Sequence, residues 1–162
     1  VIRRYKPQSF LKGDILDTKG KVIGKHDGII NFTIGQRKGI KISYKEPLYV
    51  VNINAERNEV TVGTKNNLEI KKIYLKDINF LSDTKHEKEN LFIKVRSTGK
   101  LLKAKIILQN SVAEVNLMEA EAGISPGQAC VFYSKNKIGD KVLGGGWIDK
   151  AVNNYLSTQS TA

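Results

Sequence analysis

The chain has 162 residues, of which 40% are hydrophobic, so it is long enough to bury a core as one domain, alone or with a smaller companion. Lysine and arginine number 27 against 16 acidic residues, and the net charge of +11 makes nucleic acid the first partner to consider. No apolar run approaches the roughly 20 residues of a spanning helix, so we expect no membrane partner. The single cysteine, Cys130, excludes an internal disulfide, and no secretory signal is visible, which predicts a cytoplasmic protein.

Residues 1–46 are interpreted as a small, irregular unit. They are rich in glycine and basic residues, and their apolar residues occur in short pairs between turns. So short a segment is too small for a rich core of its own. Within it, residues 35–39 (GQRKG) place Gln36, Arg37 and Lys38 between two glycines that permit a tight turn. These amide and cationic donors suit phosphate or base edges.

Two predicted hairpins carry the strongest strand signals. Residues 48–53 and 59–63 flank a turn at 54–58, where asparagine permits turn geometry. In residues 91–97 the odd positions 91, 93 and 95 are apolar, and in 102–108 the even positions are apolar, which gives this second hairpin a core face. Its outward faces carry basic residues and no acidic one: Lys94, Arg96, Lys103 and Lys105.

The basic residues of this second hairpin suit a nucleic-acid partner. Cations at alternate strand positions lie about 6.6–7 Å apart, roughly the spacing of phosphates along a nucleic-acid backbone. The alternative is a merely solvated strand face, or edge lysines that discourage aggregation.

Three further strands are predicted, at 113–117, 129–134 and 141–148. The result is a mostly β fold that favours a small closed barrel of about six strands. The glycines at 144–146 would weaken a flat strand, but they suit a sharp barrel bend or a close backbone approach. Residues 66–90 fit a strand or a short helix followed by a polar loop. The tail, 151–162, is polar and is expected to fray.

Catalytic chemistry is weakly represented. Nothing resembles a nucleophile with its activating base, a phosphate loop ending in Lys-Ser or Lys-Thr, or a cysteine pair. His26 beside Asp27 is a candidate general base, but a turn histidine flanked by solvated charges is the favoured interpretation. Two widely separated histidines and one cysteine form no metal site. Cys130 lies in an apolar stretch, which favours a small buried hydrophobe over a catalytic thiol.

Five separated motifs occur in the order and spacing found in tRNA-specific 2-thiouridylases: 24–28 (GKHDG), 32–39 (FTIGQRKG), 49–51 (YVV), 125–128 (SPGQ) and 144–146 (GGG). The chain resembles that family from residue 13 to about residue 149. Several motifs in register are more specific than any one of them. Enzymes of the family use ATP to adenylate the wobble uridine of certain tRNAs and replace its 2-oxygen with sulfur, supplied as a cysteine persulfide.

The resemblance implies which parts of such an enzyme this chain holds. Residues 1–46 correspond to part of a small central domain, 47–150 to a carboxy-terminal, elongation-factor-like β-barrel that binds tRNA, and 151–162 to a polar tail. The family's Ser-Gly-Gly-x-Asp-Ser ATP loop and its two sulfur-carrying cysteines belong to a catalytic domain absent from this chain. The chain alone is therefore expected to be an inactive part of a sulfurtransferase, with no cofactor or metal. Its partner is tRNA, while ATP and a sulfur-donor protein act in the full-length enzyme.

Two tRNA contacts of the family fall on positions of this chain. An Arg-Tyr pair on the barrel falls on Arg96 and Ser97, and a glutamine in a Pro-Gly-Gln turn falls on Gln128. Serine lacks the aromatic ring, so only its hydroxyl remains for a phosphate. Residues 36–38 either contact tRNA or brace the catalytic domain. The alternative for the whole chain is a noncatalytic structural or protein-docking module whose positive charge is incidental.

Overall fold

The computed structural model describes residues 10–81, 91–95 and 99–159. Contacts divide the chain into two compact units, one formed by Val1–Leu68 with Asn153–Ala162 and the other by Glu69–Val152. Both are built mainly from strands, so the predicted mostly β fold is confirmed. The first unit is discontinuous in sequence, whereas the second is one continuous segment.

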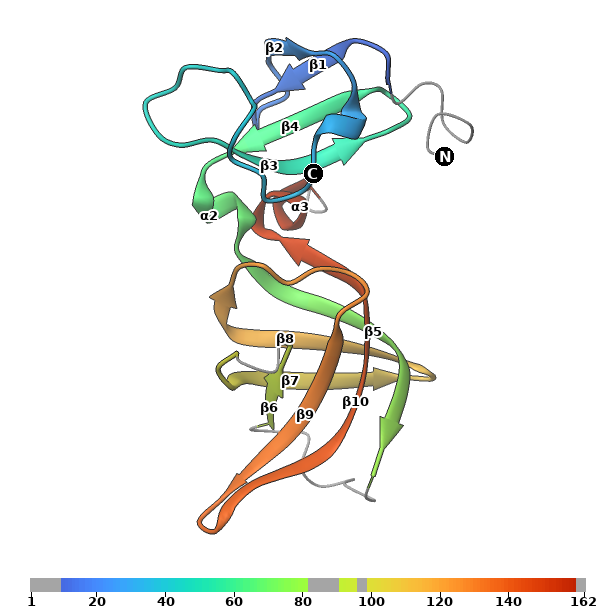
Figure 1. The fold of residues 1–162 in the computed structure, drawn as a ribbon. Helices are drawn as coiled ribbons and strands as arrows, with labels where there is room; N and C mark the ends of the chain where they lie inside the picture. Colours follow the sequence, from blue (N-terminus) through green and yellow to red (C-terminus); the bar gives the residue numbers. More distant parts are fainter. Residues whose placement is uncertain (1–9, 82–90, 96–98, 160–162) are drawn as a thin grey trace. The chain divides into compact units, whose positions relative to one another are not determined.

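The first unit contains a four-stranded sheet in the order β2-β1-β4-β3 (Figure 1). Its strands are β1 (Gly13–Leu16), β2 (Val22–His26), β3 (Tyr49–Asn54) and β4 (Glu59–Gly63), with a 3-10 turn, η2 (Ile29–Asn31), after β2. Strand β1 pairs antiparallel with β2 and parallel with β4, and β3 pairs antiparallel with β4. At the β3–β4 turn, the Asn54 side-chain oxygen accepts hydrogen bonds from the N–H groups of Glu56 and Arg57, both at 3.1 Å. The hairpin predicted in residues 48–63 is present.

The β3–β4 hairpin belongs to the first unit and not to the barrel, where the sequence interpretation placed it. The reason is the parallel pairing of β4 with β1, in which Ile15 lies opposite Val60 and both side chains are buried. Strand β3 adds Val50 to the same core. The unit thereby gains a core that residues 1–46 would lack alone, and the structural division falls after Leu68 instead of after residue 46.

The carboxy-terminal residues return to the first unit. Helix α3 (Asn154–Gln159) follows Asn153, whose side-chain oxygen accepts a hydrogen bond from the Leu156 N–H at 2.9 Å, as an N-cap residue does. The Asn153 amide also donates to the buried Val51 carbonyl at 3.0 Å. Helix α3 contacts helix α2 (Lys65–Leu68). As far as it is described, the tail is therefore a packed part of the first unit, in contrast to the expected frayed end.

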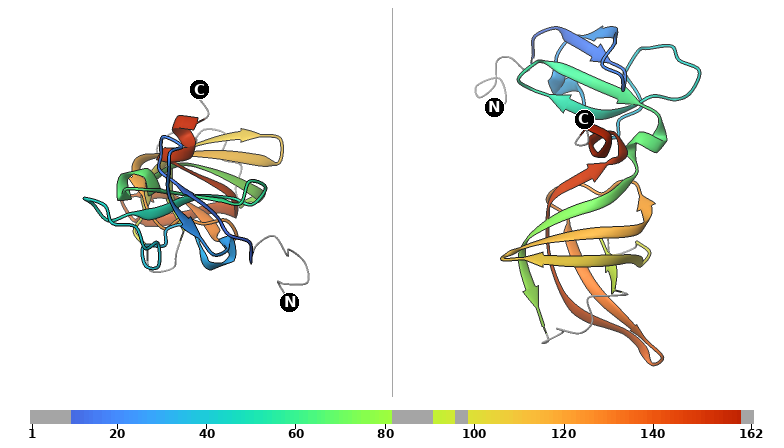
Figure 2. Two further views of the ribbon diagram at one scale, coloured as in Figure 1. Left: turned by 90° about the horizontal axis from the view of Figure 1, so that it is seen from above. Right: turned by 180° about the vertical axis from the view of Figure 1, so that it is seen from behind.

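The second unit is a closed barrel in the order β10-β5-β8-β7-β6-β9 (Figure 1), and Figure 2 shows its strands from two further sides. Its strands are β5 (Ile70–Phe80), β6 (Leu91–Lys94), β7 (Leu102–Gln109), β8 (Val112–Glu121), β9 (Ala129–Asn136) and β10 (Gly139–Asn153). The predicted six-stranded barrel is confirmed. Strand β5 resolves much of the region 66–90 that the sequence left open. The inward side chains form one apolar core, which includes Ile73, Leu75, Ile93, Val115, Phe132 and Leu143.

The glycines at 144–146 let strand β10 approach its neighbours closely. A Cβ at Gly145 would lie 2.6 Å from the Cys130 carbonyl oxygen, and one at Gly146 would lie 3.0 Å from the Lys76 carbonyl oxygen. Gly144 has a φ of 153°, which other residues rarely adopt, and the register with β9 shifts at this point. The close backbone approach predicted from the glycine run is therefore present.

Candidate nucleic-acid interface

A tight turn at residues 33–36 holds Gln36, the first predicted contact residue. The Gln36 N–H donates to the Thr33 carbonyl at 3.0 Å, and Gly35 has a φ of 90°, as the third position of a type II turn requires. The Gln36 side-chain oxygen accepts a hydrogen bond from the Thr33 N–H at 3.0 Å. The Gly35 N–H donates to the Val50 carbonyl at 2.8 Å, and the Val50 N–H donates to the Gln36 carbonyl at 2.9 Å. The turn is thus fastened to strand β3.

A second turn, at residues 125–128, repeats this arrangement on the barrel. The Gln128 N–H donates to the Ser125 carbonyl at 3.4 Å, Gly127 has a φ of 88°, and the Gln128 side-chain oxygen accepts from the Ser125 N–H at 3.2 Å. The Gly127 N–H donates to the Ile148 carbonyl, and the Ile148 N–H donates to the Gln128 carbonyl, both at 2.8 Å. Each unit therefore carries the same Ser/Thr-x-Gly-Gln turn, bonded to a strand later in the chain.

The two glutamines differ in their remaining donors. The Gln36 Nε2 donates to the Lys38 carbonyl at 2.8 Å, so both ends of this amide are used inside the loop. Among the described residues, none accepts a hydrogen bond from the Gln128 Nε2, and this side chain is partly exposed. The Gln128 amide therefore has N–H groups available to a ligand. Gln36, by contrast, is built into the structure of its own loop.

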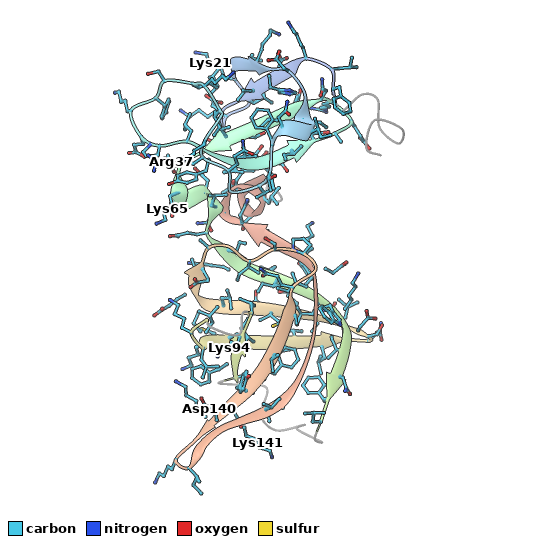
Figure 3. All side chains as sticks on the ribbon, viewed as in Figure 1. Lys21, Arg37, Lys65, Lys94, Asp140 and Lys141 are labelled. Carbon is cyan, nitrogen blue, oxygen red and sulfur yellow. The ribbon has the colours of Figure 1, made fainter. Side chains whose placement is uncertain are left out.

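Arg37 and Lys38 extend from the first turn. Both are exposed, and neither forms an ion pair within the described ranges of the chain. Arg37 borders an open hollow of about 480 Å³ whose other lining residues lie at 39–48, and it is labelled in Figure 3. Tyr44, on the same lining, is 61% exposed. The loop therefore combines free cations with an exposed aromatic ring.

The second group of predicted contacts lies on the outside of the barrel. Lys94 is on β6, where Figure 3 labels it, and Lys103 and Lys105 are on the neighbouring strand β7. Lys103 and Lys105 are exposed and alternate with buried apolar residues, as the period of two predicted. No ion pair joins these three lysines to any described residue. Arg96 and Ser97 lie outside the described residues.

The Gln128 turn and the lysines occupy connected strands. Strand β9 begins directly after Gln128, and its Val131 lies opposite Lys94 of β6. At about 3.3 Å per residue, Val131 is about 10 Å along the strand from Gln128, and Lys94 lies beside Val131. Strand β6 in turn pairs with β7, where Phe92 lies opposite Lys103. Three adjacent strands, β9, β6 and β7, therefore carry the turn and the lysines.

Two of the acidic residues on the next strand, β8, are already engaged, whereas the exposed Glu119 forms no ion pair with any described residue. Glu114 pairs with Lys72 at 3.3 Å and accepts a hydrogen bond from the Asn116 amide at 3.0 Å. The Asn116 hydrogen bond, and after it the interactions with Lys72, hold the pKa of Glu114 below its ordinary value. Glu121 pairs with Lys100 at 3.2 Å. These pairs leave the lysines of β6 and β7 as net positive charge.

His26, the candidate general base, has a structural role. It is 4% exposed, its Nδ1 accepts a hydrogen bond from the Gly28 N–H at 3.0 Å, and its Nε2 donates to the Asn58 carbonyl oxygen at 3.1 Å. The Phe32 ring packs edge-on with a centroid distance of 5.5 Å. The neighbours of His26 in sequence are exposed, as expected, but the ring itself is buried. Both ring nitrogens are occupied, so this histidine does not serve as a base.

The remaining candidates for catalysis or cofactor binding are also structural. Cys130 is fully buried, and burial raises the pKa of its thiol to about 12, so no reactive thiolate forms near neutral pH. The described residues include no group of three His, Cys, Asp or Glu side chains able to hold a metal. Of the helices in the described ranges, none has the length and apolar character to cross a membrane.

Each of the two units matches a domain of a known protein family. Residues 1–64 match the family described as the tRNA methyl transferase PRC-barrel domain, and residues 70–148 match the Aminomethyltransferase beta-barrel domain. The interval between the two matches contains the structural division after Leu68. The chain therefore consists of two β units, each similar to a domain of a known family.

The curated relatives narrow this class to one family. The chain is 45% identical over 159 residues to the tRNA-specific 2-thiouridylase MnmA of Afipia carboxidovorans, covering 95% of this chain and 40% of the relative. It is 48% identical over 150 residues to the corresponding protein of Wolbachia from Drosophila simulans, covering 91% of this chain and 39% of the relative. It is 44% identical over 151 residues to that of Ehrlichia ruminantium, covering 91% of this chain and 40% of the relative. The chain belongs to the tRNA-specific 2-thiouridylase family. It spans about two fifths of the length of the curated relatives it matches.

Proposed function

We propose that this chain is the tRNA-binding, carboxy-terminal portion of a tRNA 2-thiouridylase. The observation that carries the proposal is the placement of Gln128 and three lysines on adjacent barrel strands. The lysines, Lys94, Lys103 and Lys105, have no ion-pair partner among the described residues and can take phosphates. The free Nε2 of Gln128 can donate to a phosphate or to a ribose hydroxyl.

The first unit contributes a second contact in this proposal. Gln36 holds its loop in shape through both ends of its amide, and the exposed Arg37 and Lys38 reach the tRNA. Gln36 is then a positioning residue. Bracing of a catalytic domain by the same loop remains the alternative, and it predicts that removing the two cations leaves tRNA affinity unchanged.

The chemistry is assigned to parts of the protein beyond these residues. Adenylation of the wobble uridine with ATP, and its thiolation with sulfur from a donor protein, need groups that the described residues do not supply. The chain alone is therefore an inactive part of a sulfurtransferase. Its work is to hold the substrate by electrostatic and hydrogen-bonding contacts, in the cytoplasm where tRNA is modified.

The test is a salt titration of this chain against unmodified tRNA that reads lysine or glutamate codons, with single-stranded DNA of equal length as the control. Four phosphate contacts give a log-log salt slope of about −3 to −4. The Lys103→Ala variant should weaken binding and bring the slope about one unit nearer zero. Lys71→Ala is the matched control, because Lys71 is an exposed lysine on β5, away from β6 and β7 in the strand order.

Equal affinity for tRNA and DNA, or no binding at physiological salt, would contradict the proposal and favour the protein-docking alternative. Equal effects of Lys103→Ala and Lys71→Ala would remove the β6–β7 surface from the interface. The two results are separable, because the first concerns the unmodified chain and the second only its variants.

A further inference from the structure

Two aromatic rings share the outer barrel surface with the lysines. Phe92 on β6 lies opposite Tyr133 on β9 and, on its other side, opposite Lys103 on β7. Both rings are partly exposed, whereas the neighbouring Phe132 is fully buried, so Phe92 and Tyr133 face outward. Because paired strands lie about 4.8 Å apart, the two rings and the lysine form one row across three strands.

Further lysines flank this row. Lys94 lies two residues further along β6, while Lys105 and Lys135 lie two residues further along the antiparallel strands β7 and β9, on the other side of the row. The Nζ of Lys135 is 4.5 Å from the centroid of the Phe92 ring, a cation–π contact. Asp140 on β10 lies opposite Lys135 but forms no ion pair with it. The rings therefore sit between cations on both sides.

We propose that Phe92 and Tyr133 form a stacking platform for an unpaired base of tRNA, an inference that rests on the tRNA-binding role proposed above. A ring on a strand surface meets the face of a base only when that base has left its own stack, as bases in RNA loops do. The flanking lysines then bind the phosphates before and after this base. In a duplex the neighbouring base pairs cover the base faces, so the platform selects single-stranded RNA.

The combination of rings and cations favours RNA over an acidic protein. An acidic polypeptide would neutralise the lysines but would offer the rings no flat partner. A nucleotide supplies both a phosphate for a lysine and a flat base for a ring. The strand pairing sets these groups about 5 Å apart across neighbouring strands and about 7 Å apart along a strand, within reach of successive nucleotides.

The test compares single-stranded and duplex RNA binding by the full 162-residue chain. The probes are a short oligoribonucleotide carrying a fluorescent adenine analogue, the same sequence as a blunt duplex, and unmodified tRNA. In Phe92→Leu and Tyr133→Leu, affinity for the single strand should fall between about fivefold and about 150-fold, and stacking-induced quenching of the analogue should be lost. Duplex affinity should stay within about twofold, and the salt slope should not change, because no charge is removed.

The matched control is Tyr74→Leu, since Tyr74 is a partly exposed aromatic residue on β5, opposite Glu114. It should bind both RNAs like the unmodified chain. Tyr133→Trp should retain single-strand affinity, and a thermal melt of each variant establishes that it is folded. Loss of affinity in Tyr133→Leu with recovery in Tyr133→Trp would support a stacking role over a merely structural one.

Two outcomes separate the inference from the proposed function. If the unmodified chain binds tRNA with the expected salt slope but both leucine variants bind the single strand normally, the platform is refuted and the tRNA-binding role stands. If the unmodified chain binds no RNA, both the stacking platform and the tRNA-binding role are refuted. Displacement of the single strand by polyglutamate as readily as by tRNA, together with unchanged binding in the ring variants, would assign the surface to an acidic protein.

Discussion

The Gln128 amide gives the sharpest test of the interface, because one substitution separates its two roles. Gln128→Glu keeps a side-chain oxygen that can accept the Ser125 N–H, a bond of 3.2 Å in the structure. It removes the Nε2 donor, which has no hydrogen-bond partner among the described residues. We therefore expect the free energy of unfolding to change by less than about 0.5 kcal/mol, while tRNA binding weakens.

The size of the binding loss follows from two contributions. Loss of a hydrogen bond to a charged phosphate costs about 1.5 kcal/mol, or roughly tenfold in affinity. A carboxylate about 5 Å from a phosphate in water adds a repulsion of about 0.8 kcal/mol, or roughly fourfold. The expected loss is about 40-fold in the dissociation constant, measured by fluorescence anisotropy with unmodified tRNA at low salt. Raising the salt should reduce the repulsive part.

Gln36→Ala is the counterpart with the opposite signature. It deletes two hydrogen bonds inside the loop, at 3.0 Å from the Thr33 N–H and at 2.8 Å to the Lys38 carbonyl. At about 0.5–1.5 kcal/mol each, the free energy of unfolding should fall by about 1–3 kcal/mol in urea denaturation, with only a few-fold effect on tRNA affinity. A Gln128→Glu variant that binds tRNA within about twofold of the unmodified chain would refute the role given to its amide.

Two further predictions concern stability. Asn153→Ala removes the N-cap of α3 and leaves the buried Val51 carbonyl without its donor, so the free energy of unfolding should fall by about 2–4 kcal/mol in urea; a loss below about 1 kcal/mol would contradict this account. The pKa of the Cys130 thiol is raised from 9.0 to about 12, so the unfolded chain releases this proton at lower pH than the folded chain. The free energy of unfolding should therefore fall as pH rises from about 9 to about 12. Urea denaturation at a series of pH values should find a weaker fall in Cys130→Ala.

The barrel was predictable because its strands carry local signals. Alternation in residues 102–108 placed Lys103 and Lys105 outside, and the glycines at 144–146 indicated close backbone approach. The position of the β3–β4 hairpin was not predictable in the same way. Its alternation fits either sheet, and the choice depends on the parallel pairing of Val60 with Ile15, 45 residues earlier in the sequence.

The interface was predicted only in part for a related reason. Gln36 and Gln128 stood out as separate polar residues, but the equivalence of their turns depends on hydrogen bonds to Val50 and Ile148, which lie well beyond each turn. The pairing of Phe92 with Tyr133 likewise joins strands far apart in the chain. Asn153 looked like part of a polar tail, because a single buried amide leaves no periodic pattern.

The return of α3 to the first unit makes the barrel an insertion between two parts of another domain. During synthesis, the residues that complete the first unit, Asn153–Ala162, follow the whole of the barrel segment Glu69–Val152. Truncation after residue 152 would therefore damage the amino-terminal unit and spare the barrel. For protein engineering, the same topology means that the barrel can be exchanged as a cassette at two junctions, after Leu68 and before Asn153, whereas the first unit must be moved as two pieces.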